Sequence, residues 1–596
     1  MHPTFHAGIV YNPLQQKTKE YVGQDINIVV KAPTSSGKTI TAEQFIFSKI
    51  EEGYKAIYLS PLKALTEEKK KAWVEQPYSI LTVTSDYAQP QAFTQDLILM
   101  TTEALDSKTR GRKTWLSKVG TLVVDEAHLL GSLGRGDALE TGLMRFTQIN
   151  PEAQIIFLSA TIPNASSMAE WLTRMNSKHT EVIDTDWRPV ILNHNLVISE
   201  NEEWNLNKKV QHTVYSLAKE FPNKQVLIFV HSIGKGHTLS KALECPFHYS
   251  KLTKDKKASL ELAFEEKKIQ RMVSTSTLAW GRNLPADIVV VVGAERGPTE
   301  VDPLDIQQMA GRAGRFGMSE EGHVYYIFKQ HHAKEYYEKV TNIPPVDSVL
   351  DSRLHFHLVS FIYREKMDLP TIREFLSRSF YGEIDIEKHL TPMEELGIIE
   401  RDGDFLSVDR IGRAAALMYI DPYDLYSLKL NLEERPTTPY KLAIAFANIP
   451  SYAYPCFIPK DIETQAIQMP YAQQTIVATS LHQWLKGETL SPTAAVTIPP
   501  LVNDIERWTS GLGIAGLSTS YINAIKHMLL NGVDENLAPL VEIEGIGRAR
   551  ASKLYTAGIR SPEDIPKNPK IAKGIITEKV YNRFMDKLDG KVTLRF

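Results

Sequence analysis

The chain has 596 residues, of which 43% are hydrophobic and 23% charged, and its formal net charge is −3. This length predicts about three to five globular domains, and so small a charge means that a polyanionic partner must be held by local basic patches. The two cysteines, Cys245 and Cys456, exclude a disulfide framework and a cysteine-rich metal site.

Membrane and secretion signals are absent from the sequence. No apolar stretch approaches the ~18 residues of a membrane span, and the densest one, 288–292, has the length of a buried strand. The first residues lack the basic and apolar regions of a signal peptide. We therefore expect a cytosolic protein with no membrane partner.

An apolar run at 28–30 leads into a loop of small residues and then into Gly37-Lys38-Thr39. The β-branched run predicts a buried strand, and the loop, followed by a helix, predicts a nest of N–H groups for phosphate. Lys38 can reach the β- and γ-phosphates, and Thr39 can offer a hydroxyl to Mg²⁺. The rest of the loop is Ala32, Pro33, Thr34, Ser35 and Ser36, with Ala32 where the usual motif has its first glycine. Upstream, Gln15 has an amide that could read adenine.

Further short apolar runs are separated by stretches long enough to form a helix, and each run is followed by a cluster of polar residues. The runs 56–59, 96–100, 121–124 and 155–158 predict strands of a parallel α/β sheet, whose ligands gather at the carboxyl ends of its strands. At one such end stand Asp125 and Glu126. A Mg²⁺ ion that is bound to nucleotide needs a hard oxygen ligand, which suits Asp125. Hydrolysis needs a carboxylate to deprotonate the attacking water, which suits Glu126.

A second alternating segment begins near residue 191, with predicted strands at 225–230, 271–276 and 288–292 and no second phosphate loop. It carries Gln308-Met-Ala-Gly-Arg312-Ala-Gly-Arg315, which we interpret as two arginines on one face of a helix. Guanidinium groups grip phosphate oxygens bidentately. An arginine from a neighbouring domain can stabilise the charge that develops during phosphoryl transfer.

Taken in order, these motifs resemble those of superfamily 2 DExH-box helicases. The matching segments are Gln15, A-P-T-S-S-G-K-T, S-P-L-K-A-L, T-T-E-A-L, D-E-A-H, S-A-T, T-L-A-W-G-R-N-L-P-A and Q-M-A-G-R-A-G-R. The resemblance covers about residues 11–316 and implies two RecA-like domains with ATP in their cleft. It implies catalytic roles for Glu126, Gln308, Arg312 and Arg315, coupling of hydrolysis to motion by His128, Ser159 and Thr161, and a nucleic-acid contact at Thr101.

Beyond the motor the sequence changes character. Two helical patterns lead to apolar runs on either side of the turn 401–404, which predicts a β-hairpin and hence a winged helix. Such a module binds nucleic acid or serves as a packing piece. Residues 426–535 predict helices with an irregular patch at 450–470, and Trp508 lies on one of the helices. At 540–550 a glycine-rich turn with Gly545, Gly547, Arg548 and Arg550 resembles a helix–hairpin–helix, whose N–H groups face phosphate.

This ending is similar to that of the archaeal helicase-308 family, relatives of the helicase half of DNA polymerase theta. The resemblance implies a helical ratchet domain across the DNA path, base stacking on Trp508 and movement from 3′ to 5′. Two departures stand out. Leu501 lies about two helical turns before Trp508, where a basic residue is expected, and the segment 286–307, where the family places its strand-separating hairpin, is short and acidic.

The expected fold is therefore α/β and multidomain. The predicted domains are RecA-like domain 1 (1–190), RecA-like domain 2 (191–345), a winged helix (346–425), a helical ratchet domain (426–535) and a helix–hairpin–helix domain (536–596). The expected activity is ATP- and Mg²⁺-dependent 3′–5′ unwinding of single-stranded, forked or gapped DNA by a monomer, in replication-fork repair. Two alternatives stay open: an RNA helicase of the same superfamily, and an ATP-switched DNA-binding factor that does not separate strands.

Overall fold

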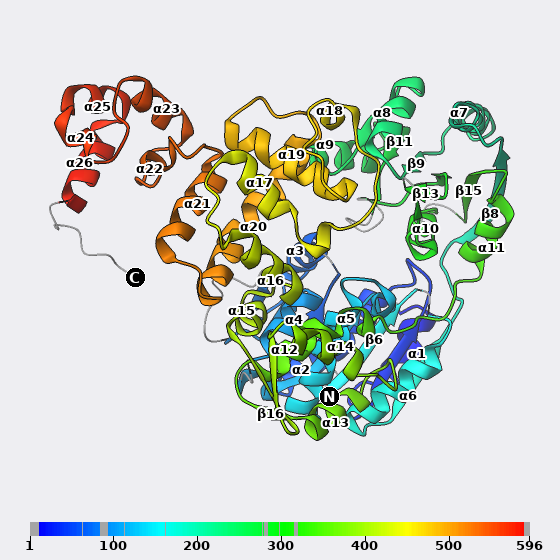
Figure 1. Cartoon of the computed structure of the whole chain (residues 1–596). Coiled ribbons are helices and arrows are strands. Elements are labelled where there is room, and N and C mark those ends of the chain that lie inside the picture. The colour runs from blue at the N-terminus through cyan, green and yellow to red at the C-terminus, as the bar shows by residue number, and fades with distance from the viewer. Residues whose placement is uncertain are drawn as a thin grey trace. The chain divides into compact units, whose positions relative to one another are not determined.

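The structure is a computed structural model that describes residues 11–588 apart from 62, 84–92, 112–113, 161, 277, 279–283, 297–298 and 315–319. The chain divides into two compact units (Figure 1). The first comprises Met1–Arg353 with Glu374–Ile384, and the second comprises Leu354–Arg373 with Asp385–Phe596. Within the described residues, no helix has both the length and the apolarity needed to cross a membrane.

The first unit begins with a seven-stranded sheet in the order β3-β4-β2-β5-β6-β1-β7, in which all neighbours are parallel. Its central strands are buried over nearly their whole length, as expected for a sheet covered by helices on both faces. The strands are β1 (Asn27–Lys31), β2 (Lys55–Leu59), β3 (Ile80–Val83), β4 (Leu97–Met100), β5 (Val119–Asp125), β6 (Gln154–Ser159) and β7 (Thr180–Asp184). The helices are α1 (Pro13–Lys19), α2 (Lys38–Glu51), α3 (Lys63–Trp73), α4 (Thr102–Thr109), α5 (Gly136–Ile149) and α6 (Ala165–Asn176), with 3₁₀ turns η2 (Thr114–Lys118) and η3 (Ala127–Gly131).

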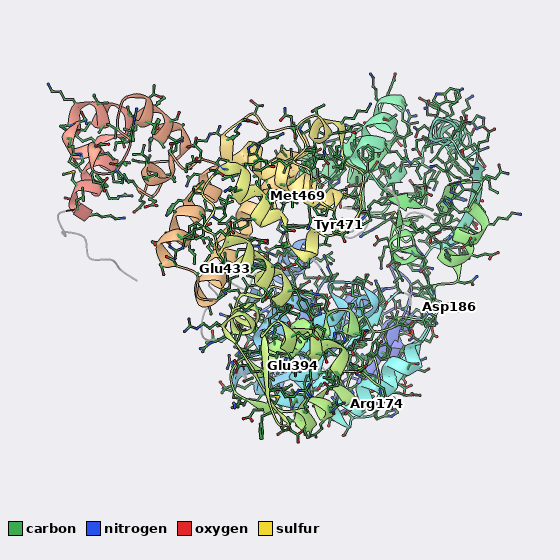
Figure 2. The ribbon with its side chains drawn as sticks, in the orientation of Figure 1. Arg174, Asp186, Glu394, Glu433, Met469 and Tyr471 are labelled. Carbon is green, nitrogen blue, oxygen red and sulfur yellow. The ribbon has the colours of Figure 1, made fainter. Side chains whose placement is uncertain are left out.

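After β7 the chain passes through an irregular stretch that includes the exposed Asp186 and enters a second sheet (Figure 2). This sheet has the order β10-β11-β9-β12-β15-β8 and is also parallel throughout. Its strands are β8 (Ile191–Ser199), β9 (Val226–Val230), β10 (Phe247–His248), β11 (Arg271–Ser274), β12 (Ile288–Val292) and β15 (Glu321–Lys329). The helices are α7 (Glu203–Glu220), α8 (Ile233–Ala242), α9 (Lys254–Glu265), α10 (Pro303–Ala310) and α11 (Ala333–Thr341), followed by η4 (Leu350–Arg353).

Alternation along the central strands of this second sheet builds two separate cores. Leu227 and Phe229 join a cluster with Phe264 of α9 and Met309 of α10. Their neighbours in β9, residues 228 and 230, join a different cluster with helices α7 and α8. Successive side chains of a strand point to opposite faces, so an unbroken apolar run needs helices on both sides. The two predicted RecA-like parallel-sheet domains are confirmed.

A short antiparallel pair, β13 (Glu295–Arg296) and β14 (Thr299–Glu300), follows β12 directly. It falls within 286–307, the segment where the resemblance to helicases places a strand-separating hairpin. The segment is short, as the sequence indicated, but its backbone still pairs as a hairpin.

The second unit opens with helices α12 (Leu354–Ile362), α13 (Leu369–Ser377), whose last turn belongs to the first unit, α14 (Glu387–Glu395) and α15 (Arg410–Met418). A small sheet in the order β16-β18-β17 accompanies them, made of β16 (Met367–Asp368), β17 (Ile399–Asp402) and β18 (Phe405–Val408). Asp402 pairs with Phe405 across a turn in which Gly403 has φ 61°. Helices with one β-hairpin are the arrangement predicted for a winged helix.

Helices make up the rest of the second unit. They are α16 (Pro422–Leu432), α17 (Pro439–Ala447), α18 (Lys460–Glu463), α19 (Ala472–Lys486), α20 (Ala494–Ile514), α21 (Thr519–Asn531), α22 (Ala538–Val541), α23 (Arg548–Thr556), α24 (Asp564–Lys567), α25 (Pro569–Ile575) and α26 (Glu578–Leu588), with a 3₁₀ turn η5 (Pro450–Tyr452). The long irregular stretch between α17 and α19 coincides with the proline-rich patch predicted at 450–470.

Candidate nucleotide site and predicted nucleic-acid contacts

The loop between β1 and α2 is shaped for an anion. Gly37 caps α2 with φ 88°, and Ser35 has φ 66°, so the loop curls and the helix N-terminus faces its concave side. A Cβ at position 37 would lie 2.3 Å from the side-chain nitrogen of Gln15, so the close approach requires glycine. Lys38 Nζ donates to the carbonyls of Ala32 (2.8 Å) and Pro33 (3.0 Å). Burial lowers the pKa of Lys38, and the carboxylates of 125 and 126 oppose that shift.

Residues at the start of helix α1 hydrogen-bond to this loop. Asn12 Nδ2 donates to the carbonyl of Ser36 at 2.8 Å, and Gln15 Nε2 donates to that of Gly37 at 3.4 Å. Asn12 and Gln15 also form a capping box at the start of α1, and only 3% of Gln15 is exposed. The amide of Gln15 therefore supports the phosphate loop, and its role in reading adenine stays a prediction.

The two predicted metal ligands each have a protein partner. Thr39 Oγ1 accepts a hydrogen bond from Lys69 Nζ at 2.6 Å, and Asp125 Oδ2 accepts one from the hydroxyl of Tyr58 at 2.6 Å. A hydroxyl and a carboxylate are the hard oxygen donors that Mg²⁺ takes beside nucleotide phosphates, so this donor set suits that ion. Lys69, from α3, is a residue that sequence reasoning missed.

Glu126 occupies a strained position directly after β5. Its φ of 57° and ψ of 52° are left-handed, a conformation that costs free energy in a residue other than glycine and that clusters at functional sites. Burial and then the neighbouring Asp125 raise the pKa of Glu126 to about 7, while Lys38 and Arg312 oppose the shift. A carboxylate that titrates near neutral pH is suited to accept a proton from water.

His128 connects Glu126 to the end of β6. Burial, with a smaller effect of Lys38, lowers the pKa of His128 to about 3, so the ring is neutral. Its Nδ1 lies 2.9 Å from Ser159 Oγ and 3.4 Å from Glu126 Oε2. The predicted coupling residues His128 and Ser159 are thus in contact beside the predicted base. Thr161, the third of them, lies outside the described residues.

The second RecA-like domain reaches this site from the other side. Gln308 Nε2 donates to Glu126 Oε2 at 3.2 Å, and Thr34 Oγ1 donates to the carbonyl of Gly311 at 3.4 Å. A Cβ at Gly311 would lie 2.3 Å from Thr34 Oγ1, so the two domains meet closely here. Burial lowers the pKa of Arg312, and the carboxylates of Glu68 and Glu126 oppose that shift. The structure brings Gln308 and Arg312 into the nucleotide cleft, whereas Arg315 lies outside the described residues.

One expectation about this motif is wrong. Helix α10 ends at Ala310, so Arg312 lies in the following turn and not on a helical face. The backbone there pairs with Ala286: the Ala286 N–H donates to the carbonyl of Arg312 at 2.9 Å, and the Gly314 N–H donates to that of Ala286 at 2.7 Å. This pairing and the positive φ of Gly314 accompany the end of the helix before Arg312.

Arg188, in the segment between the two sheets, was not singled out from the sequence. Its Nη2 donates to the carbonyls of Gly311 (3.0 Å) and Ala313 (2.9 Å), and its Nη1 lies 3.4 Å from Thr34 Oγ1. Burial lowers the pKa of Arg188 to about 10, so it stays charged at neutral pH. It lines a cavity of about 380 Å³ together with Pro33 and Tyr326. The guanidinium of Arg188 thus contacts both the phosphate loop of the first domain and the arginine motif of the second.

The predicted nucleic-acid residues are spread over both units. In the first, Thr101 is 6% exposed and its hydroxyl caps α4 by accepting from the N–H of Ala104 at 3.4 Å. In the second, Trp508 lies half-buried on α20, on the same helix as Leu501. Neither arrangement tests a contact with nucleic acid, so both residues stay predictions.

The glycine turn that was predicted to face phosphate lies directly before α23, and its contact with phosphate stays a prediction. Gly545 (φ 91°) and Gly547 are exposed, and Arg550 Nη1 donates to the carbonyl of Gly545 at 2.6 Å. The guanidinium of Arg548 packs against Gly487, where an added Cβ would meet it at 2.3 Å. The side chain of Arg548 therefore packs against the C-terminal end of α19. The sequence did not predict this contact.

Comparison with known proteins agrees with this architecture. The DEAD/DEAH box helicase family matches residues 12–169, and the helicase conserved C-terminal domain matches residues 208–317. The ATP-dependent DNA helicase Hel308 of Pyrococcus abyssi is 28% identical and aligns with 93% of this chain and 90% of its own length. The proteins of the same name from Thermoplasma acidophilum (28%, 92% of this chain and 91% of theirs) and Thermoplasma volcanium (26%, 90% and 89%) are similarly related.

The paired parallel sheets, the phosphate loop and the Gln308–Arg312 motif opposite it define a superfamily 2 helicase. The similarity to Hel308 helicases extends beyond these two domains over 93% of the chain, so the protein is a Hel308-like helicase with a large helical C-terminal region.

Proposed function

We propose that this protein is an ATP- and Mg²⁺-dependent DNA helicase that moves 3′ to 5′ along one strand and separates forked or gapped duplex. The observation that carries the proposal is the contact of Gln308 with Glu126, because it joins the candidate base of the first RecA-like domain to the arginine motif of the second. The names of the relatives, which are DNA helicases, support DNA as the substrate.

In the proposed mechanism the loop N–H groups and Lys38 bind the phosphates of ATP, while Thr39 and Asp125 would hold Mg²⁺, which would supply positive charge to offset that of the phosphates. Glu126 accepts the proton of the attacking water. Arg312 stabilises the negative charge on the transferring phosphoryl group, and Arg315 is proposed to share this role. Loss of the γ-phosphate removes a shared ligand of both domains, so the cleft loosens and the motor steps.

The β13–β14 hairpin supports strand separation by this motor, since it gives the short segment 286–307 a paired backbone that can stand between strands. We propose that Trp508 stacks on a base, a contact worth ~1–3 kcal/mol. The exposed glycine turn at Gly545 and Gly547, with Arg550, is proposed to bind the backbone of DNA without reading its sequence. Thr101 is proposed to contact the strand in the first domain. The monomeric state, the cytosolic location and the role in fork repair are part of the same proposal.

Strand displacement with four matched substrates tests this function: 3′-tailed and 5′-tailed duplexes of DNA and of RNA at one salt concentration. We expect ATP-dependent displacement of the 3′-tailed DNA only. Displacement of RNA alone would assign an RNA helicase. DNA-stimulated hydrolysis without displacement of any strand would assign an ATP-switched binding factor, and faster displacement from the 5′ tail would reverse the polarity.

A further inference from the structure

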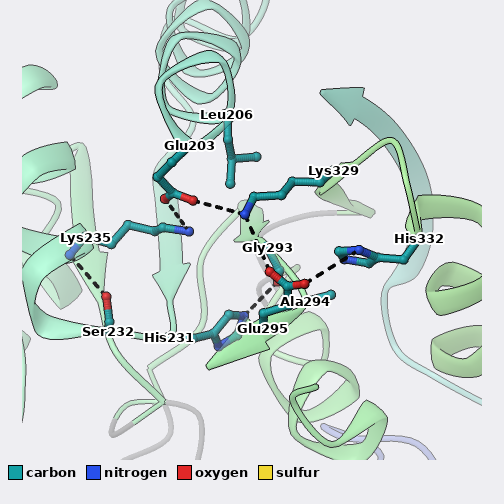
Figure 3. Close-up of a pocket in the computed structure, with 10 residues that line it drawn as sticks. All are labelled: Glu203, Leu206, His231, Ser232, Lys235, Gly293, Ala294, Glu295, Lys329 and His332. Atoms are coloured by element: carbon teal, nitrogen blue, oxygen red, sulfur yellow. Dashed lines mark hydrogen bonds and ion pairs between the residues drawn. The ribbon is translucent and has the colours of Figure 1, made fainter. Parts of the chain in front are cut away.

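Three adjacent strands of the second RecA-like domain deliver metal-ligating side chains to one place. β9, β12 and β15 are parallel neighbours, so the residues that follow them meet at one edge of the sheet. His231 follows β9, Glu295 follows β12 after two residues, and His331-His332 follow β15. His231, Glu295 and His332 line a cavity of about 240 Å³, which Figure 3 shows with Glu295 and His332 facing each other, and His331 adjoins His332 in the chain. None of these residues belongs to the helicase motifs described above.

We propose that Glu295, His331 and His332 form a binding site for a divalent transition-metal ion such as Zn²⁺. Their ligand atoms all lie within 4.8 Å of one another. Glu295 Oε1 is 3.4 Å from His331 Nε2 and 3.9 Å from His332 Nδ1. Donor atoms that bind one Zn²⁺ tetrahedrally at ~2.0–2.2 Å are separated by roughly 3.3 Å. The two carboxylate distances are therefore already close to a coordination shell.

The two imidazole nitrogens that face each other are closer still. His331 Nε2 and His332 Nδ1 are 2.5 Å apart, with the ring planes at 74°. Two such nitrogens must share either a proton or a cation, because their lone pairs repel. A bound ion requires the rings to separate by less than about 1 Å, a small rotation for His331, which lies on the surface.

The surroundings prepare His331 as a ligand. Its Nδ1 lies 2.9 Å from Asn201 Oδ1, and an amide oxygen can only accept, so Nδ1 carries the proton. Nε2 is then left with its lone pair toward the cluster, the tautomer that binds metal. A hydrogen bond of this kind to the second ring nitrogen orients metal-ligating histidines.

A second observation concerns the wall of the same cavity. His231, which is 7% exposed, donates through Nε2 to the carbonyl of Gly293 at 2.9 Å, and its buried Nδ1 has no hydrogen-bond partner. A carbonyl only accepts, so Nε2 is protonated and Nδ1 offers a lone pair. His231 thus places a third imidazole in the wall of the cavity, beside Glu295 and His332.

The lysines beside the cluster are paired with carboxylates, so Lys329 competes with a metal ion for Glu295. Lys329 Nζ contacts Glu295 Oε2 at 3.5 Å, the oxygen on the side away from the histidines, and Glu203 at 3.4 Å. Glu203 also pairs with Lys235 at 2.8 Å. A metal ion here would tie β13 of the hairpin to the turn between β15 and α11. Imidazole and carboxylate ligands without thiolate suit Zn²⁺, Ni²⁺ or Co²⁺ rather than Mg²⁺.

Co²⁺ titration of the full chain, freed of any histidine tag and of nucleotide and dialysed against chelator, tests the site by visible absorption. We expect one ion per chain with a four- or five-coordinate spectrum, displaced by Zn²⁺. His332→Ala is expected to weaken binding at least tenfold, and Asn201→Ala by about tenfold. Lys329→Met is expected to tighten binding, because it frees the second oxygen of Glu295; a purely structural ion-pair network would not respond in this way.

His179→Ala is the matched control, since His179 pairs with Glu181 at 3.5 Å on the surface and has no second histidine beside it. It should leave Co²⁺ affinity unchanged. Circular dichroism checks that each variant is folded. Absence of Co²⁺ binding by the wild type, or binding that His332→Ala leaves intact, would overturn the proposal and leave a metal-free ion-pair network.

Discussion

Gln308 donates its side-chain amide to Glu126 Oε2 at 3.2 Å, and this hydrogen bond joins residues 182 positions apart in sequence. One partner follows a strand of the first sheet, and the other lies on the helix that precedes the arginine turn of the second domain. In the proposed mechanism a change at the candidate base Glu126 would therefore reach the other RecA-like domain directly through this hydrogen bond.

Glu126→Gln should bind ATP but hydrolyse it about 10²–10⁴-fold more slowly, because the amide cannot take the proton of water. Equilibrium binding of a fluorescent ATP analogue and single-turnover hydrolysis separate the two effects. Lys38→Ala serves as the contrast, since it removes phosphate positioning and should weaken binding as well. Wild-type turnover in Glu126→Gln would remove Glu126 from the mechanism.

Arg188→Ala should lower the kcat of DNA-stimulated hydrolysis by between about tenfold and 100-fold, while nucleotide affinity changes little. Arg188 positions the arginine turn through two carbonyls and the phosphate loop through Thr34, so its loss should disturb the alignment of the two domains more than the binding of nucleotide. Arg188→Lys should restore little, because an ammonium cannot reproduce the planar fork. A rise in KM with unchanged kcat would contradict this positioning role.

Glu140 should make stability depend on pH. It is fully buried, its oxygens accept from Ser348 Oγ and from the N–H groups of Phe380 and Tyr381, and burial raises its pKa from 4.5 to about 7. Because the folded-state pKa is raised, its contribution is fully present below pH 4.5 and is lost as pH rises to about 7. The full loss is roughly 3 kcal/mol at 1.36 kcal/mol per unit.

Glu140→Gln removes this titration and keeps both an acceptor and a donor in place. We expect the wild type to lose stability relative to Glu140→Gln between pH 4.5 and 7 and the difference to stay constant above about pH 7.5, measured by denaturant unfolding across that range. Parallel pH curves for the two proteins would show that Glu140 does not titrate there.

Asp106→Asn should destabilise the first unit by about 3–5 kcal/mol, because it removes a fully buried negative charge that pairs with two arginines. Arg110 contacts it at 2.5 Å, and Arg145 contacts its other oxygen. Asp184→Asn is the control: its pair with Lys31 is largely exposed, so its removal should change the free energy of unfolding by less than about 0.5 kcal/mol. Equal effects of the two substitutions would refute the burial argument.

Contiguous motifs made much of this molecule predictable. The phosphate loop, Asp125-Glu126 and the buried strands each show in a few neighbouring residues, because a strand end fixes where the next side chains go. The hairpin of β17 and β18 was also predictable, because a turn rich in Asp and Gly favours a β-hairpin.

Long-range contacts were not predictable in the same way. Arg188 binds carbonyls of residues 123 and 125 positions away, and a backbone carbonyl has no signature in sequence. The cluster of Glu295, His331 and His332 depends on β12 and β15 being neighbours. The helix predicted through Arg312 failed for a similar reason, because Ala286, which pairs with the turn after the helix, lies far back in the chain. The contact of Arg548 with Gly487 likewise depends on the start of α23 lying beside the end of α19.

The most direct measurement of the central claim is single-turnover ATP hydrolysis by Arg312→Ala in the presence of single-stranded DNA, beside the binding affinity of the same variant for ATP. If the two RecA-like domains form one catalytic site, hydrolysis falls by about 10³–10⁵-fold while ATP still binds to the loop of the first domain. Hydrolysis at the wild-type rate would show that the first domain works alone, and the account of a shared cleft would be wrong.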